Sequence, residues 1–103
     1  MFNMSDLANL EARLDAVTLP LLMPLRASKT LDGVAMTELL QIGRDLVEVV
    51  STLDLVPRTL VGKSWFLFTQ MLSEADHTRT PEPILDAAWQ WQGFLRRAFG
   101  KRS

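Results

Sequence analysis

The sequence predicts an all-α fold: a compact bundle of four main helices with a proline-punctuated apolar connector after the first helix. Two observations support this prediction. Apolar residues recur every three or four positions in four separate segments, which is the period of an amphipathic helix. No segment shows the sustained alternation of apolar and polar residues that marks a strand. Helices that are joined by short loops are typical of a bundle.

The chain has the size and composition of one globular domain. It has 103 residues, of which 48% are hydrophobic and 22% are charged, as in ordinary folded domains. We expect residues 1–100 to form a single helical domain. Residues 101–103, Lys-Arg-Ser, are expected to fray as a basic C-terminal tail.

The first helix is predicted to begin at Ser5, a preferred N-cap residue. Four apolar residues then recur at spacings of three, four and three: Leu7, Leu10, Leu14 and Val17. Pro20 is expected to end this helix, because proline lacks an N–H and clashes with the preceding turn. The connector follows, since residues 19–25 are apolar but are interrupted by Pro20 and Pro24. Residues 26–33 then resemble a polar loop.

The second helix is predicted to begin at Thr37 and to end at Leu55-Val56-Pro57. Gly43 lies inside its broad apolar stripe. An interior glycine costs about 1 kcal/mol relative to alanine, so we expect a close helix crossing there.

The third helix is predicted to run from Pro57 to about His77. Its side opposite the main apolar face is small or aromatic rather than charged, which predicts contacts on two sides. The fourth helix is predicted to have Thr80 as its N-cap, Pro81 as its first residue and Gly100 as its C-terminal cap.

Charge and cysteine content narrow the function classes. Residues 1–56 carry eight acids and four bases, hence −4, and residues 57–103 carry seven bases and four acids, hence +3. The whole chain has a net charge of −1, which argues against a free-standing nucleic-acid binder. The chain has no cysteine, which fits a reducing cytoplasm. No signal peptide or membrane-spanning run is evident.

Surplus aromatic residues predict a protein-interaction surface. Phe66 lies opposite the main stripe of the third helix, and Trp89 and Phe94 flank the stripe of the fourth. Arginine and aromatic residues are enriched at interfaces, so we add Arg96 and Arg97 to this surface. The alternative is intramolecular, with residues 19–25 folded over these aromatic residues.

A helix-turn-helix DNA-binding regulator is the second hypothesis. The helix that begins near Pro57 would be the recognition helix, with Arg58, Thr59 and Lys63 at its N-terminal end. Against this hypothesis, the same helix continues into the apolar run Trp65-Phe66-Leu67-Phe68.

A metal-binding helical protein is the third hypothesis. Glu74 and His77 form a Glu-x-x-His pair, which di-iron bundles use. One chain supplies one such pair, so only a dimer could complete the site. Both residues are expected to face solvent, and a polar helix end explains them.

The function that the sequence favours is a non-enzymatic helical protein-interaction module that associates with itself. An adaptor, a regulator and a toxin-neutralising protein would all show this pattern. The chain carries no catalytic signature, and we expect neither an enzyme nor a bound cofactor. The expected partner is a second copy or another protein in the cytoplasm, rather than a nucleic acid or a membrane.

Overall fold

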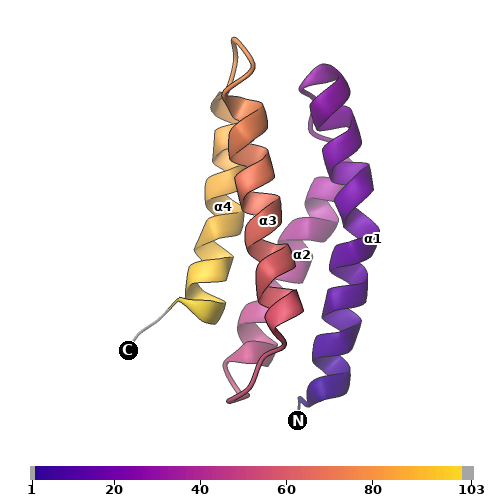
Figure 1. The fold of residues 1–103 in the computed structure, drawn as a ribbon, viewed down its shortest axis with the longest axis vertical. Coiled ribbons are helices and arrows are strands. Elements are labelled where there is room, and N and C mark those ends of the chain that lie inside the picture. The colour runs from indigo at the N-terminus through magenta and orange to yellow at the C-terminus, as the bar shows by residue number, and fades with distance from the viewer. Residues whose placement is uncertain (1, 101–103) are drawn as a thin grey trace.

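A computed structural model describes residues 2–100, and these residues form the predicted all-α bundle (Figure 1). No strand occurs within this range. The four helices are α1 (Met4–Ser28), α2 (Gly33–Val50), α3 (Arg58–Ala75) and α4 (Glu82–Phe99). The predicted fraying of residues 101–103 concerns residues outside the described range.

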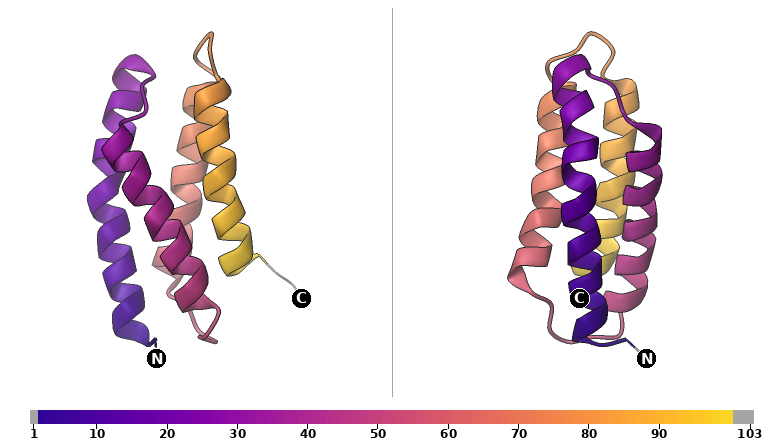
Figure 2. Two further views of the ribbon diagram at one scale, coloured as in Figure 1. Left: turned by 180° about the vertical axis from the view of Figure 1, so that it is seen from behind. Right: turned by 90° about the vertical axis from the view of Figure 1, so that its right-hand side faces the viewer.

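The helices alternate in direction, so α1 and α3 run one way and α2 and α4 run the other (Figures 1 and 2). Within residues 2–100, α1 packs against α2 and α3, and α4 packs against the same two helices. The pairs α1–α4 and α2–α3 therefore lie diagonally opposite each other. The loop of residues 51–57 crosses one end of the bundle between α2 and α3.

The core lies along the axis between the four helices. Trp91 of α4 is its largest fully buried side chain. The indole Nε1–H of Trp91 donates a hydrogen bond of 2.9 Å to the backbone carbonyl of Ser64 on α3. The Ser64 hydroxyl is also buried and donates to the Leu60 carbonyl at 2.7 Å. Both buried polar groups are thus satisfied, which the apolar surroundings require.

The predicted connector after the first helix is wrong, because α1 continues through Pro20 and Pro24 to Ser28. Leu21, Leu22 and Leu25 are fully buried. Burial of such a side chain contributes about 1.5–3 kcal/mol, and an interior proline costs about 3 kcal/mol. The three leucines therefore offset the two prolines.

The position of Pro20 lowers the cost further. In a continuous helix its missing N–H would have bonded the carbonyl of Ala16, and both residues are exposed. Water can therefore satisfy that carbonyl. The helix ends at Lys29, whose N–H bonds the Leu25 carbonyl at 3.0 Å and whose left-handed backbone (φ 57°) turns the Thr30 N–H to the Pro24 carbonyl at 3.3 Å.

The predicted starts of the first two helices are also wrong. The N-cap of α1 is Asn3 rather than Ser5, since Asn3 and Asp6 form a reciprocal capping box. The N-cap of α2 is Asp32 rather than Thr37, and the Asp32 carboxylate accepts from the Ala35 N–H at 2.9 Å. In each case an earlier polar side chain satisfies the free N–H groups.

The second helix ends earlier than predicted, at Val50 rather than near Pro57. Hydroxyl groups explain this end. Ser51 Oγ donates to the Glu48 carbonyl at 2.8 Å, and Thr52 Oγ1 donates to the Val49 carbonyl at 2.9 Å. These bonds satisfy the last carbonyls of the helix.

The predicted bounds of the last two helices are closer. Helix α3 begins at Arg58, one residue after the predicted Pro57, and it ends at Ala75, two residues before His77. Helix α4 has Pro81 as its N-cap, one residue after the predicted Thr80. Gly100 is the C-cap as predicted, and its N–H bonds the Arg96 carbonyl at 3.0 Å.

Candidate interaction surface

Trp89 lies at the junction of α3 and α4, where it belongs to an aromatic row. Its ring is 5.5 Å from that of Phe68, and the Phe68 ring meets Trp65 edge-on at 5.8 Å. Trp89 remains 50% exposed. The segment of residues 19–25 does not cover it, because that segment is part of α1, which is diagonal to α4.

Phe94 lies at the other edge of α4, against α2. A Cβ added to Gly43 would come within 2.4 Å of Phe94 Cδ2, so the ring lies directly on the glycine. The predicted close helix crossing at Gly43 is therefore confirmed. The guanidinium of Arg97 lies 4.9 Å from the centre of the Phe94 ring. Phe94 thus serves mainly to pack α4 on α2.

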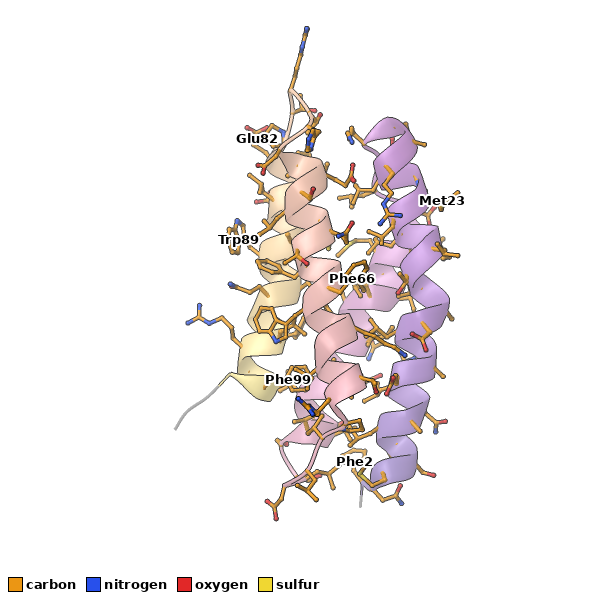
Figure 3. All side chains as sticks on the ribbon, viewed as in Figure 1. Phe2, Met23, Phe66, Glu82, Trp89 and Phe99 are labelled. Carbon is orange, nitrogen blue, oxygen red and sulfur yellow. The ribbon has the colours of Figure 1, made fainter. Side chains whose placement is uncertain are left out.

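Phe66 lies elsewhere, on the side of α3 that is next to α1, whereas Trp89 points away from α1 (Figure 3). Phe66 is 49% exposed, and Arg96 is exposed in the last turn of α4. The five residues of the predicted surface therefore do not come together. Among them, Arg97 contacts Phe94, and Arg96 and Arg97 line one shallow hollow with Gly93 and Gly100.

The residues of the helix-turn-helix hypothesis do not form a DNA-binding surface. Arg58 and Thr59 are exposed, but the ammonium of Lys63 bonds Glu11 at 2.7 Å and Asp15 at 3.1 Å. A helix-turn-helix also packs its two helices at a steep angle against each other. Here α2 and α3 are diagonal and do not pack together.

The Glu-x-x-His pair does not converge on a common point. The Glu74 carboxylate forms an ion pair with Lys29, while His77 Nδ1 lies 2.7 Å from the Ser73 carbonyl oxygen. Among residues 2–100 no cluster of three or more potential metal ligands occurs.

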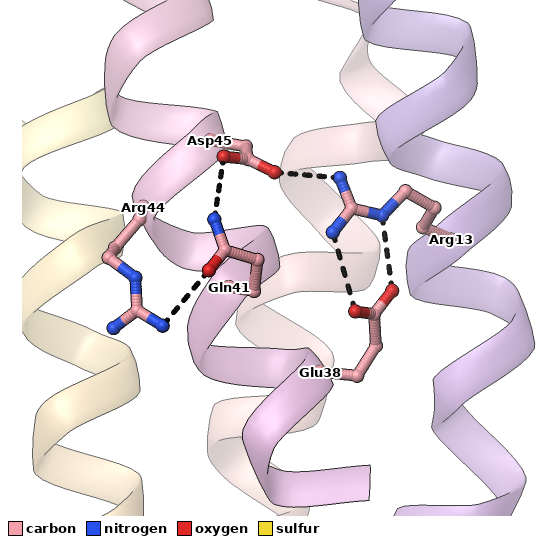
Figure 4. A network of polar contacts seen from close by, with 5 residues as sticks. All are labelled: Arg13, Glu38, Gln41, Arg44 and Asp45. Carbon is pink, nitrogen blue, oxygen red and sulfur yellow. Dashed lines mark hydrogen bonds and ion pairs between the residues drawn. The ribbon is translucent and has the colours of Figure 1, made fainter. Parts of the chain in front are cut away.

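A polar network joins α1 to α2 (Figure 4). Arg13 donates to Glu38 at 3.1 and 3.4 Å and to Asp45 at 2.8 Å. Gln41 also donates to Asp45, and Arg44 donates to Gln41. The hydrogen bond to Glu38, followed by that to Asp45, raises the pKa of Arg13. Every member has a partner, so the network aligns the two helices and offers no free group for chemistry.

A second set of ion pairs joins α1 to α3. The hydrogen bond from Lys63 lowers the pKa of Glu11, and the same bond, together with that to Asp15, raises the pKa of Lys63. Further along, Arg26 donates to Gln70 at 3.0 Å. Lys29 and Glu74 form the ion pair beyond it.

These contacts involve all the charged side chains of α1, and they leave its outward face without charge. Asp6 is used in the N-cap, and the other four residues contact α2 or α3: Glu11, Arg13, Asp15 and Arg26. The outward face is apolar instead. We call the six exposed apolar residues of this face the outer stripe of α1: Ala8, Ala12, Ala16, Leu19, Met23 and Ala27. The exposed polar residues Ser5 and Asn9 lie on the same face at its N-terminal end.

The outer stripe is flanked on both sides by apolar side chains. Leu19 and Met23 are themselves 61% and 59% exposed. On the α2 side, Val34 is 81% exposed and lines an apolar groove of about 240 Å³ with Ala16 and Pro20. On the α3 side lies Phe66 (Figure 3).

The outer stripe was not predicted from the sequence, because Pro20 was expected to end the first helix. Leu19 and Met23 then belonged to a connector, and the alanines before them had no larger neighbours on their face. The signal that reveals the stripe is the continued spacing of three and four residues across both prolines.

Comparison of the chain with protein-family models, with curated proteins and with solved structures finds no match in any of the three. Within residues 2–100, none of the helices is apolar over a sufficient length to cross a membrane.

Proposed function

We propose that this chain is a non-enzymatic helical protein-interaction module whose contact surface is the outer stripe of α1. One observation carries the proposal: α1 is apolar on two opposite faces. Leu7, Leu14 and Leu21 mark the face that is buried in the bundle, and the outer stripe marks the face that is left to solvent. A helix that only closed a bundle would have polar residues there.

The size of the stripe supports the same proposal. Its first and last residues are 19 positions apart, which is about 29 Å at 1.5 Å per residue. At the width of one helix face this is an uncharged patch of roughly 300 Å², a size that is often functional on a monomer. The charged side chains of α1 beside the stripe each have a hydrogen-bond partner on α2 or α3, so a partner protein can cover the stripe without leaving these groups unsatisfied.

As part of this proposal we place the protein in the cytoplasm, since a cysteine-free chain gains nothing from an oxidising compartment. An adaptor or regulatory role fits a chain that offers a surface rather than a reactive group. A helix-turn-helix role has less support, because Lys63 is ion-paired and α2 and α3 do not pack together.

A capture experiment with matched variants tests the proposal. Ala12→Glu adds a carboxylate to the outer stripe, and Gln90→Glu adds one to the exposed polar side of α4. Tagged wild type and both variants are recovered from the cells that naturally make the protein, with nuclease treatment of half of each sample. Each captured protein is identified and purified, and its affinity is then measured directly.

We expect a purified partner, or a second copy of the chain, to bind, and this binding to survive nuclease treatment. Ala12→Glu should weaken this binding at least about tenfold, because the carboxylate would be buried unpaired. Gln90→Glu should leave it unchanged. Wild-type protein that binds neither itself nor any captured protein would overturn the proposal, and so would binding that Ala12→Glu leaves intact.

A further inference from the structure

The outer stripe of α1 has the same spacing in both directions along the helix. Its six residues are separated by four, four, three, four and four positions. A two-fold axis across α1, midway between Ala16 and Leu19, therefore brings every residue of the stripe opposite another residue of the stripe in a second, antiparallel copy. The pairs are Ala8 with Ala27, Ala12 with Met23, and Ala16 with Leu19.

These pairs are complementary in size. Each of the two large side chains, Leu19 and Met23, lies opposite an alanine of the other copy. Side chains of one helix pack into the spaces between those of another, so a large residue facing a small one lets two helices approach closely. A parallel arrangement would place Leu19 against Leu19 and leave the alanines facing each other across a gap.

Charge favours the antiparallel arrangement as well. On the α3 side of α1, two carboxylates, Glu11 and Asp15, with one cation, Lys63, leave −1 beside the N-terminal half of the helix. Near its C-terminal half the balance is +1, from Arg26, Lys29 and Glu74. A two-fold axis across α1 places the α3 side of one copy beside the α3 side of the other. Because the copies are antiparallel, the negative half of each then lies beside the positive half of the other.

The apolar flanks lie at the level of this axis. Val34 lines the groove beside Ala16 and Pro20. On the other side, Phe66 lies one turn after Lys63, which bonds Asp15, and one turn before Gln70, which bonds Arg26. Both flanks would widen the contact where the two copies are closest.

We propose that the outer stripe of α1 is the contact surface of an antiparallel homodimer, with the two-fold axis between Ala16 and Leu19. This inference rests on the proposed function and names its partner, a second copy of this chain. The stripe alone is smaller than the roughly 800 Å² per partner of a standard interface. The dimer interface is therefore small, and we expect weak association with a dissociation constant of micromolar order.

Disulfide cross-linking tests the register, because the natural chain has no cysteine. Ala12→Cys and Met23→Cys chains are oxidised mildly, separately and as an equal mixture. In the proposed dimer Ala12 lies opposite Met23, whereas the two copies of Ala12 are about 17 Å apart. A disulfide needs Cα atoms within about 7 Å. Gln41→Cys, at an exposed position of α2, is the control for random collision.

Sedimentation equilibrium of the cysteine-free wild type, from about 1 to about 500 µM, accompanies the cross-linking. The proposal expects a reversible dimer, and a cross-linked dimer in the mixture at least about fivefold above the level of either variant alone. Cross-linking of Ala12→Cys alone at the level of the mixture would overturn the antiparallel register. A wild type that stays monomeric at every concentration would overturn the homodimer. The proposed interaction module would still stand if a purified partner bound through the outer stripe. Failure of the homodimer and failure of the proposed function can therefore be told apart.

Discussion

The ring of Phe94 on α4 rests directly on Gly43 of α2, at a distance that excludes a side chain at position 43. Cδ2 and Cγ of the ring would lie 2.4 and 2.7 Å from an added Cβ. Cγ is close to the backbone of Phe94 and cannot move freely. The glycine is therefore needed for the packing of α2 against α4.

Gly43→Ala should therefore lower the free energy of unfolding by about 1–3 kcal/mol, the usual cost of overpacking. Gly62→Ala is the matched control, because its added Cβ meets nothing within 4 Å in α3. That change should stabilise the protein by about 0.5–1 kcal/mol. Urea denaturation measures both. Equal stabilities of the two variants would show that the ring moves aside.

Trp91→Phe should lower the free energy of unfolding by about 2–4 kcal/mol, since it removes buried surface together with the hydrogen bond to the Ser64 carbonyl. Ser64→Ala should change stability by less than about 1 kcal/mol, because the Ser64 hydroxyl bonds only within its own helix. Denaturation followed by far-ultraviolet circular dichroism compares the two. A larger loss for Ser64→Ala would contradict this ranking.

Pro20→Ala should raise the free energy of unfolding by about 1–3 kcal/mol. Alanine restores the N–H that an interior helix position needs, and proline costs about 3 kcal/mol there. The site is exposed, so the smaller side chain leaves no cavity. Thermal denaturation measures the change. A loss of stability would mean that residues 18–28 are not a regular continuation of α1.

The Glu11–Lys63 pair should make stability depend on pH in the acid range. The folded-state pKa of Glu11 is lowered by the hydrogen bond from Lys63. The pair therefore contributes stability above the unfolded pKa of about 4.3, and this contribution is lost as pH falls through the lowered pKa. The wild type should be more stable than Glu11→Gln at neutral pH.

The difference between wild type and Glu11→Gln should shrink as pH falls from about 5 to about 3. Glu48→Gln, which changes an exposed carboxylate of α2, serves as the control and should follow the wild-type profile. Urea denaturation across this pH range provides the comparison. A constant difference between wild type and Glu11→Gln would rule out this linkage.

The periodicity of the sequence was sufficient to predict four helices, the bundle and the close crossing at Gly43, because each depends on local spacing or on one glycine. The length of the first helix could not be predicted in this way. A proline normally ends a helix, and only the tertiary burial of Leu21, Leu22 and Leu25 reverses that rule.

The candidate surface was harder to predict for the same reason. Surplus aromatic residues can be counted in a sequence, but their coverage depends on which helices are neighbours. Phe94 packs on α2, Trp89 joins the aromatic row of α3, and only Phe66 lies beside the outer stripe. The diagonal placement of α2 and α3 decides which neighbours each aromatic side chain has, and no local sequence pattern reveals that placement.

Self-association through the outer stripe can be measured residue by residue in a concentration series of amide nuclear magnetic resonance spectra of the wild-type protein. We expect concentration-dependent shifts at Ala8, Ala12, Ala16, Leu19, Met23 and Ala27, with smaller shifts around Val34 and Phe66. The exposed polar faces of α2 and α4, including Gln41 and Gln90, should stay unchanged. Spectra that do not change with concentration, or shifts centred on Trp89 instead, would contradict self-association through the outer stripe of α1.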